Sequence, residues 1–427
     1  MIIGGGFGGL AASQTLRNAD AEVTVIDRTN HHIFQPLLYQ VATAALAPSD
    51  ITAPIRWILR RQQNTTVLLG EISSIDVDRK IVSMDYGSRE IPYDYLIVAT
   101  GSRHAYFGHE EWEPLAPGLK AIEDATEIRR RFLLAFERAE KATDETERDA
   151  YLTFVIVGGG PTGVELSGAL PMIARKALYP DFRHIDTRKT RVILLEGGPR
   201  ILPTFPESLA STAQRDLSDL GVEVHTSSIV TRIEPDAVYV GDERYSTRTV
   251  FWAAGNLASP LGKTLGAPLD YAGRVLVQPD LSLPGHREVF VIGDLALVER
   301  EGLSPVPGVA QAAQQEGRTA AKNIRRLMHG AATRPFGYRN KGDLAVIGRS
   351  RAIADLTKVR FTGFFAWLFW LFVHIMLLVG FRNRLSVLVQ WAYSYFTYQR
   401  GVRLITDPEH SHAEATTKDT KSTKKNI

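Results

Sequence analysis

One stretch decides the fold of this chain: Thr153-Phe-Val-Ile-Val-Gly-Gly-Gly-Pro-Thr-Gly-Val-Glu-Leu-Ser-Gly168. Its apolar start predicts a buried parallel strand, and its end predicts a helix. Between them stand Gly158, Gly160 and Gly163, spaced as Gly-x-Gly-x-x-Gly. Strand, glycine turn and helix in this order are typical of a dinucleotide-binding unit, because the glycines let a pyrophosphate approach the helix N-terminus.

The same pattern stands at the beginning of the chain, where two isoleucines lead into Gly4, Gly6 and Gly9. Residues 22–27 then predict a strand that ends at Asp27. This acid lies close to the offset of about 20 residues expected for a carboxylate that binds a ribose hydroxyl. Two such units imply two dinucleotides, and a flavin reduced by a nicotinamide is the simplest interpretation.

The second unit also has a candidate ribose-binding acid. The strand predicted at residues 191–196 ends at Glu196, although a longer insertion separates this acid from the glycines. A carboxylate here favours NADH over NADPH, because the 2′-phosphate of NADPH would meet a like charge. Arg200 is close in sequence and weakens this preference.

Two further strand ends are candidates for the flavin site. Residues 93–98 predict a buried strand followed by a small turn with Thr100 and Gly101, which suits a close approach to the flavin nucleotide. An ordinary turn after a strand is an equally good interpretation of these residues. Asp294 ends the strand predicted at 288–293, where it can accept hydrogen bonds from ribityl hydroxyls, and its alternative role is a helix cap.

A predicted helix from Ala310 to Leu327 has the remaining candidates. The prolines and glycine before it set its start, so its positive end, at Ala310, can face the flavin pyrimidine. Gln311 and Gln315 stand four residues apart and share one face of this helix. The alternative interpretation of this pair is a polar helix surface.

Composition narrows the class of protein. A chain of 427 residues suits two or three domains, and a net charge of +3 is too slight to indicate a nucleic-acid partner. The absence of cysteine excludes disulfides, thiolate metal sites and redox-active cysteine pairs. The adjacent His31 and His32 have no accompanying carboxylate cluster, so we expect a packed loop and no metal.

The beginning of the chain carries two more expectations. No secretory signal precedes the first strand, which indicates cytoplasmic residence of the catalytic part. That strand is also shorter than the usual 5 to 6 residues or so, and we therefore expect the natural chain to begin earlier.

Residues 361–381 are apolar and long enough to span a bilayer by the rule of about 20 residues. Gly363, His374, Gly380 and the many aromatic rings instead favour the membrane interface. We therefore expect peripheral binding ahead of spanning, and spanning ahead of a core helix or dimer contact. The arginines expected to pair with anionic headgroups are Arg360, Arg382, Arg384, Arg400 and Arg403.

The assembled pattern resembles the flavoproteins with two dinucleotide-binding domains. Within that superfamily, Phe-Gln-Pro-Leu-Leu-Tyr at 34–39, Gly-Pro-Thr-Gly-Val-Glu at 160–165, the glutamine segment at 310–315 and residues 338–349 resemble type II NADH:quinone oxidoreductases. The resemblance covers residues 1 to about 405. Because cysteine is absent, the chain cannot relay electrons as disulfide reductases and sulfide:quinone reductases do.

The resemblance implies roles for particular groups. FAD would be held non-covalently by the first unit and NADH would bind the second. Gln311 and Gln315 would line a quinone site, and Glu165 would lie near the junction of nicotinamide, flavin and quinone. A monotopic membrane anchor and a homodimer are also implied.

The resulting prediction is an α/β protein with two Rossmann-like dinucleotide-binding domains and C-terminal membrane-anchoring helices. We expect a discontinuous FAD domain at 1–115 and 261–345, an inserted NADH domain at 116–260, an anchoring region at 346–405 and a disordered polar tail at 406–427. The predicted enzyme passes two electrons from NADH through FAD to ubiquinone or menaquinone, without proton pumping, at the cytoplasmic face of the inner or plasma membrane. The alternatives are a flavin reductase with a soluble acceptor and an NADH-binding redox sensor.

Overall fold

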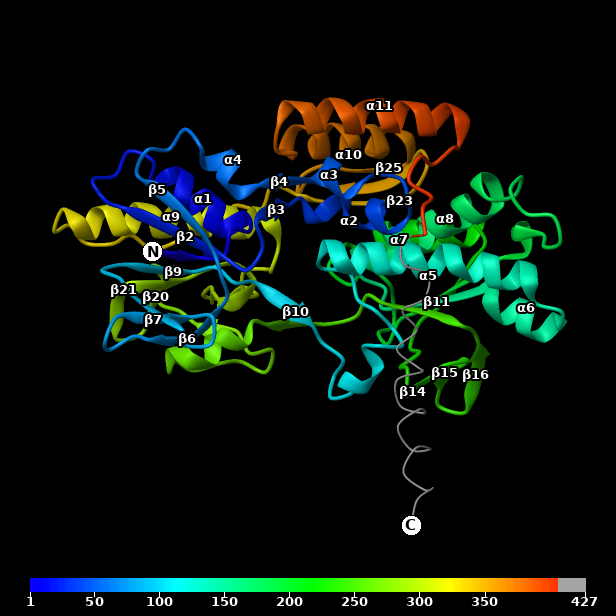
Figure 1. Ribbon diagram of the computed structural model, residues 1–427, viewed down its shortest axis with the longest axis horizontal. Coiled ribbons are helices and arrows are strands. Elements are labelled where there is room, and N and C mark those ends of the chain that lie inside the picture. The colour runs from blue at the N-terminus through cyan, green and yellow to red at the C-terminus, as the bar shows by residue number, and fades with distance from the viewer. Residues whose placement is uncertain (406–427) are drawn as a thin grey trace, which may run out of the picture.

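The structure is a computed structural model that describes residues 1–405. The predicted tail at 406–427 lies outside the described residues. Figure 1 shows two lobes side by side, each containing a sheet, with two C-terminal helices stacked at the top of the view.

The first lobe is built on a six-stranded sheet in the order β20-β21-β9-β1-β2-β5. Its strands are β1 (Ile2–Ile3), β2 (Val23–Asp27), β5 (Thr65–Leu69), β9 (Leu96–Val98), β20 (Ser282–Leu283) and β21 (His286–Val291). All neighbours are parallel except β20 and β21. Although β1 has only two residues, both are buried between β2 and β9. Because β20 and β21 come from the second half of the chain, this domain is discontinuous, as predicted.

Helix α1 (Phe7–Thr15) packs directly on α9 (Ala310–Met328), the predicted glutamine helix. Their approach is close: a Cβ on Gly317 would lie 2.2 Å from the carbonyl oxygen of Gly8. This contact brings the N-terminal end of α9 to the glycine turn between β1 and α1.

The second lobe has a four-stranded, all-parallel sheet in the order β13-β12-β11-β17. Its strands are β11 (Thr153–Val157), β12 (Arg191–Leu195), β13 (Val222–His225) and β17 (Thr249–Trp252), and its main helices are α5 (Ile122–Lys141), α7 (Pro161–Met172) and α8 (Glu207–Asp219). Two antiparallel strands, β10 (Ser102–His104) and β18 (Asn256–Ala258), connect the lobes. The second domain is therefore inserted into the first, while the precise boundaries stay a prediction.

The C-terminal part begins with an antiparallel sheet of β23 (Asp343–Gly348), β24 (Arg351–Asp355) and β25 (Arg360–Thr362). Helix α7 lies so close to β23 that a Cβ on Gly168 would lie 1.7 Å from the carbonyl oxygen of Ile347. Two helices follow, α10 (Gly363–Leu377) and α11 (Phe381–Thr397). The apolar stretch at 361–381 is thus interrupted, because Gly380, with φ of +90°, separates the two helices.

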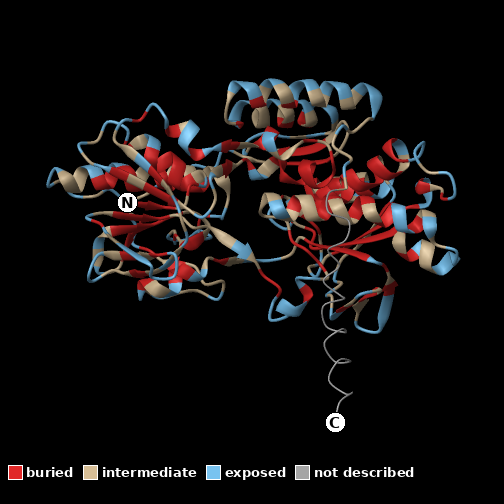
Figure 2. Ribbon diagram, in the orientation of Figure 1, coloured by how far each residue is buried: buried red, intermediate tan, exposed pale blue. Residues whose placement is uncertain are grey.

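Burial differs sharply between the sheets and the C-terminal helices. Figure 2 shows buried residues concentrated in the two sheets, whereas α10 and α11 are exposed over much of their length. Within residues 1–405, no helix combines the length and the apolar character needed to cross a membrane.

The remaining elements are short. They are β3 (His31–Ile33), α2 (Leu38–Ala42), α3 (Pro48–Ile51), β4 (Thr52–Pro54), α4 (Ile55–Leu59), β6 (Ile72–Asp76), β7 (Ile81–Met84), β8 (Arg89–Pro92), α6 (Glu145–Tyr151), β14 (Arg232–Glu234), β15 (Ala237–Val240), β16 (Glu243–Ser246), β19 (Val275–Leu276) and β22 (Ala296–Leu297). The histidine pair expected in a loop lies on β3, which pairs with β4. His32 is buried and hydrogen-bonds the carbonyl oxygen of Gly5 through Nδ1.

Candidate active site

A large cleft opens beside the ends of β1, β2 and β9. Its cavity volume is about 450 Å³, within the roughly 300–1,000 Å³ of a ligand pocket, so a cofactor-sized ligand can bind there. The predicted flavin residues that line this cleft are Gly4, Gly6, Asp27, Thr100, Gly101, Asp294 and Ala310. The structure therefore brings together residues that are far apart in the sequence.

Each glycine of the first unit meets a different steric demand. Gly4 has φ of +99°, and a Cβ there would lie 2.4 Å from the carbonyl oxygen of Ala99. A Cβ on Gly9 would lie 1.8 Å from the carbonyl oxygen of Gly4, so α1 can pack on the turn only without that side chain. A Cβ on Gly6 would meet nothing within 4 Å, because this position faces the open cleft.

The second unit repeats this division. Gly158 has φ of +106°, and a Cβ there would lie 2.7 Å from the backbone of Ala253. A Cβ on Gly163 would lie 1.8 Å from the carbonyl oxygen of Gly158, whereas a Cβ on Gly160 would meet nothing within 4 Å. In both turns the first and third glycines serve protein packing, and the middle glycine leaves room for a ligand.

The two predicted acids occupy equivalent places. Asp27 Oδ2 accepts a hydrogen bond of 2.6 Å from the amide of Gly5, and Glu196 Oε2 accepts one of 2.5 Å from the amide of Gly159. Each acid thus stands at the end of its strand, against the adjacent glycine turn. This is where a carboxylate can reach the ribose of a dinucleotide whose pyrophosphate lies on the turn.

Arg200 does not offset the charge of Glu196 as expected. Its guanidinium donates to the carbonyl oxygens of Phe205 and Pro203 at 2.8 and 2.9 Å. In the described part of the chain no ion pair joins Arg200 to Glu196. The carboxylate of Glu196 is instead hydrogen-bonded by the backbone amides of Gly159 and Gly198.

The polar groups of the first cleft fit a flavin dinucleotide. Thr100 Oγ1 and His31 Nε2 are buried, line the cleft and have no hydrogen-bond partner in the protein. Buried polar atoms are almost always paired, so a polar ligand in the cleft accounts for both. Asp294 Oδ2 accepts a 2.7 Å hydrogen bond from Ser102 Oγ, and Lys120 Nζ donates to the same hydroxyl at 2.9 Å.

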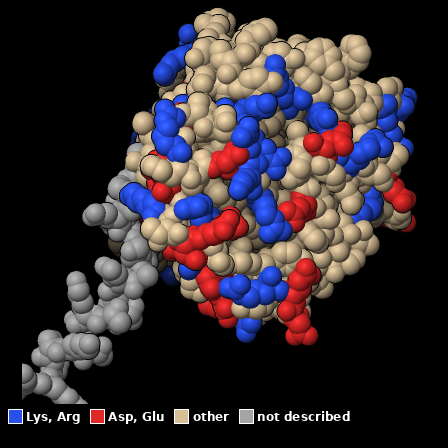
Figure 3. All heavy atoms as spheres, turned by 90° about the vertical axis from the view of Figure 1, so that its right-hand side faces the viewer, with Lys and Arg blue, Asp and Glu red and all other residues tan. Residues whose placement is uncertain are grey.

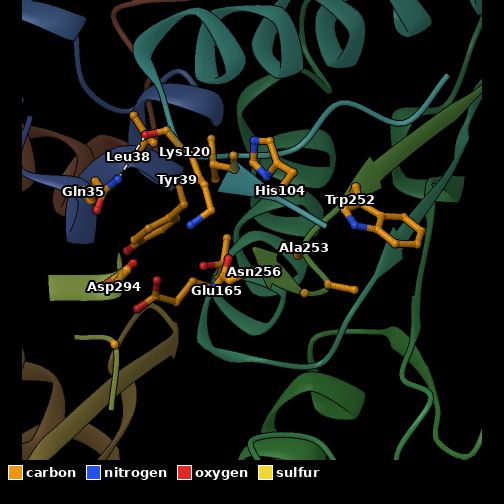
Figure 4. A pocket seen from close by; sticks show the side chains of 15 residues that line it. Gln35, Leu38, Tyr39, His104, Lys120, Glu165, Trp252, Ala253, Asn256 and Asp294 are labelled. Atoms are coloured by element: carbon orange, nitrogen blue, oxygen red, sulfur yellow. Dashed lines mark hydrogen bonds between the residues drawn. The ribbon is translucent and has the colours of Figure 1, made fainter. Parts of the chain in front are cut away.

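A second cavity lies between the lobes and meets the first cleft (Figure 4). Gln35, Lys120, Asp294 and Gly308 line both spaces. From the second lobe it is lined by Thr162, which follows the glycine turn, and by residues 252–256 at the end of β17. The two dinucleotide-binding units therefore open into one shared space.

Glu165, on α7, stands in this shared space. Figure 4 shows its side chain pointing toward those of Tyr39 and Asp294. Burial raises the pKa of Glu165 to about 8, although a hydrogen bond from the backbone of Val346 acts in the opposite direction. The carboxyl group is therefore mostly protonated at pH 7 and can donate a proton.

A third cavity adjoins the second beneath α10 and α11. Tyr39 and Glu165 line both, and the rest of the third cavity is mainly apolar, with several aromatic side chains. Its further lining includes Gln40, Met172, Arg349, Trp367, Trp370, Trp391, Tyr395 and Arg400. Flat aromatic walls and few charges suit a flat, apolar ring.

Gln311 and Gln315 lie elsewhere than these cavities. Gln311 accepts a hydrogen bond from the amide of Lys341 at 2.9 Å and donates to the carbonyl oxygen of Gly342 at 3.1 Å. Gln315 makes a reciprocal pair with the backbone of Arg339, donating at 3.0 Å and accepting at 3.0 Å. Both amides hold the 339–342 segment against α9, so the structure does not group them with Glu165.

Three residues that line the cavities were not predicted as site residues: Tyr39, Lys120 and Arg400, of which Arg400 was expected at lipid headgroups. Tyr39 belongs to a segment that predicted a packed loop and carried part of the family resemblance, but no site role. Lys120 lies in a stretch without a motif. Burial lowers the pKa of Lys120, whereas Asp294 and Asp124 act in the opposite direction.

Across residues 1–405 no group of three or more metal-binding side chains occurs.

Known families match most of the chain. Residues 1–317 match the family model described as pyridine nucleotide-disulphide oxidoreductase, and residues 340–398 match the NDH2 C-terminal domain. Type II NADH:quinone oxidoreductase NdhA of Mycobacterium tuberculosis is 45% identical, with 95% of this chain and 89% of the relative covered. Ndh of the same organism, with the same description, is 43% identical, with coverages of 96% and 90%.

Solved structures show the same fold. NDH2 from Plasmodium falciparum in complex with NADH superposes with a TM-score of 0.84 at 22% identity, covering 93% of this chain and 98% of the other. The sulfide:quinone oxidoreductase of Aquifex aeolicus superposes with a TM-score of 0.71 at 19% identity, with coverages of 92% and 95%.

Proposed function

The chain belongs to the type II NADH:quinone oxidoreductases, and we propose which of its residues carry electrons from NADH to a quinone. Enzymes of this type do not pump protons. The observation that carries the proposal is the shared space between the lobes, where both dinucleotide-binding units open toward Glu165.

The flavin is FAD, bound non-covalently in the first cleft. When bound, FAD accepts a hydride from NADH and passes the electrons on to the quinone. Gly4, Gly6 and Gly9 shape the turn for its pyrophosphate. The groups that would hold its ribose, ribityl chain and ring are Asp27, Thr100, Gly101, Asp294 and Ala310.

NADH binds the second unit. Gly158, Gly160 and Gly163 form the turn for its pyrophosphate, and Glu196 accepts hydrogen bonds from its ribose. Thr162, beside this turn, and residues 252–256 line the shared space, so the nicotinamide end of NADH can lie against the flavin cleft. Catalysis then rests on holding two rings in contact while the walls exclude water.

The quinone, ubiquinone or menaquinone, reaches the flavin from the side of the C-terminal helices. Glu165 donates a proton to it, because burial keeps this carboxyl protonated near neutral pH. Gln311 and Gln315 act on this step from outside the cavities, by fixing the 339–342 segment against α9. This segment leads into β23, whose residues 346–348 line the third cavity.

The C-terminal helices bind the membrane surface from the cytoplasmic side of the inner or plasma membrane. Their exposed apolar side chains are Phe364, Phe365, Leu368, Phe372, Met376, Leu377, Phe381, Leu385, Leu388, Val389, Tyr393 and Phe396. In Figure 3 the top of the molecule, where these helices lie, is largely free of charge, and charged residues gather below it. An apolar helix face of this kind lies in the interface of a bilayer.

The predicted arginine belt is smaller than expected. Arg403 pairs with Asp181, Arg384 donates to the carbonyl oxygens of Leu378 and Met376, and Arg400 lines the third cavity. These three arginines therefore have roles inside the protein. Arg360 is exposed but also pairs with Asp355 at 3.4 Å, so Arg382 is the member of the set that is left for lipid headgroups alone. We propose further that the protein is a homodimer, which analytical ultracentrifugation in detergent tests.

Anaerobic stopped-flow absorbance on lipid-reconstituted protein tests the electron path. We expect flavin bleaching on addition of NADH and recovery of the absorbance on addition of a soluble quinone. Bleaching without recovery would favour a soluble acceptor or a sensor role and overturn the quinone assignment. A protein purified without flavin absorbance, from cells supplied with riboflavin, would refute the FAD assignment.

A further inference from the structure

A hydrogen-bond chain connects α11 with the shared space between the lobes. Trp391 Nε1, on α11, donates to Gln40 Oε1 at 2.6 Å, and Gln40 Nε2 donates to the hydroxyl oxygen of Tyr39 at 2.9 Å. Gln40 and Tyr39 are neighbours on α2 and both are buried. Trp391 is 351 residues away along the chain from Gln40, so only the docking of α11 completes this chain.

The direction of each hydrogen bond follows from the chemistry of the three side chains. An indole nitrogen can only donate, so the amide oxygen of Gln40 must face Trp391. The amide nitrogen of Gln40 then faces Tyr39, which fixes the tyrosine oxygen as the acceptor of that hydrogen bond. The hydroxyl hydrogen of Tyr39 is therefore left for a different acceptor.

The hydroxyl hydrogen of Tyr39 is available where the shared space meets the third cavity. Tyr39 lines both the shared space and the aromatic cavity, as does Glu165, and Figure 4 shows the two side chains converging. Burial, with a smaller effect of the nearby Glu165, raises the pKa of Tyr39 well above its usual range, so the hydroxyl keeps its proton. An acceptor that bound here would meet a fixed, neutral donor.

We propose that Trp391 and Gln40 are positioning residues that orient Tyr39 as a hydrogen-bond donor to a carbonyl oxygen of the bound quinone. This inference rests on the proposed function. The reduced flavin would supply two electrons and one proton, and Glu165 would supply the second proton that completes the quinol. Tyr39 keeps its own proton and stabilises the negative charge that develops on the oxygen. The contact between α11 and α2 would thereby control the rate at which the quinone reoxidises the flavin.

Three substitutions separate donation from packing. Tyr39→Phe removes the donor. Gln40→Glu keeps the shape of the chain but reverses its second hydrogen bond, because a carboxylate accepts from both Trp391 and Tyr39 and draws the tyrosine hydrogen away from the quinone. Gln390→Leu is the matched control, since Gln390 also joins α11 to the α2–α3 region, through Asp50 Oδ2 at 2.9 Å, without touching Tyr39.

The assay is anaerobic reoxidation of the NADH-reduced protein by a soluble quinone and, in parallel, by ferricyanide, which has no carbonyl oxygen. We expect Tyr39→Phe and Gln40→Glu to slow reoxidation by quinone about 10- to 100-fold, the effect of a hydrogen bond to a charged group. Reoxidation by ferricyanide and flavin reduction by NADH should keep their wild-type rates. Gln390→Leu should leave every rate unchanged.

Equal slowing with both oxidants would assign Tyr39 and Gln40 a purely structural role and overturn the inference. Wild-type quinone rates in Tyr39→Phe and Gln40→Glu would also overturn it. Failure of the proposed function looks different, because the wild-type protein itself would then not be reoxidised by quinone. Flavin content and thermal unfolding confirm that each variant is folded.

Discussion

The two glycines Gly160 and Gly163 stand three residues apart, yet their replacement by alanine should have opposite consequences. A Cβ on Gly163 would lie 1.8 Å from the carbonyl oxygen of Gly158 and would have to reach at least 3.4 Å for ordinary contact. Such overpacking costs about 1–3 kcal/mol of stability. A Cβ on Gly160 would meet no protein atom within 4 Å, and the backbone there, with φ of −70° and ψ of 180°, accepts any residue.

Gly160→Ala should therefore fold normally but bind NADH weakly. The new methyl group occupies the space through which the pyrophosphate approaches the amides of the turn. Loss of one hydrogen bond to a charged group costs about 1.5–3 kcal/mol, which corresponds to a roughly 10- to 150-fold rise in the KM for NADH. Gly163→Ala should instead lower the melting temperature.

The assay combines the KM for NADH, flavin content and thermal unfolding of both variants. Flavin content should match the wild type in Gly160→Ala, because the proposed flavin site is at the other glycine turn. An unchanged KM in Gly160→Ala would refute the placement of the NADH pyrophosphate. A wild-type melting temperature in Gly163→Ala would refute the steric reasoning for the third glycine.

Four further outcomes are expected. Because Glu165 loses its proton as pH rises through about 8, the rate of wild-type reoxidation by quinone should fall above that pH. In Glu165→Gln the rate should be low and should not change with pH. Glu196→Gln should raise the ratio of kcat/KM for NADPH to that for NADH about tenfold, since it removes a like-charge repulsion worth more than about 1.4 kcal/mol at close range. An unchanged ratio in steady-state assays would refute the role of Glu196 in cofactor selection. Gln315→Ala should slow reoxidation by quinone and spare flavin reduction, and equal loss of both steps in stopped flow would contradict its assignment. The double variant Phe365→Glu, Phe396→Glu changes side chains that are 75% and 79% exposed. Its affinity for lipid vesicles in cosedimentation should fall by about 10-fold or more per residue. Unchanged affinity would indicate that these helices face a protein partner.

The glycine units could be predicted because their requirements are local. The turn at Gly158 and the turn at Gly4 each follow an apolar strand directly, and spacing along the chain fixes their geometry. The acids Asp27 and Glu196 could be placed for the same reason, since each ends the strand next to its turn. Motifs of this kind need no knowledge of distant contacts.

The cavities could not be predicted, because they form where segments far apart in sequence meet. Tyr39 comes from α2, Glu165 from α7 and Arg400 from the end of the described chain. Arg403 was expected at the membrane for its charge, yet tertiary packing places it against Asp181. Charge alone therefore did not tell lipid-facing arginines from those bound within the protein.

Helix α7 connects the three parts of the site. It begins at the NADH turn, carries Glu165 and then, at Gly168, lies against the backbone of Ile347 on β23. The same strand supplies the Val346 amide that hydrogen-bonds Glu165. The C-terminal sheet beneath α10 and α11 thus lies against the helix that starts at the second glycine turn. A shift of that sheet would change the environment of Glu165, the proposed proton donor, without any change in the glycine turn proposed for NADH. The acceptor half-reaction should therefore depend on the C-terminal region more strongly than the NADH half-reaction does.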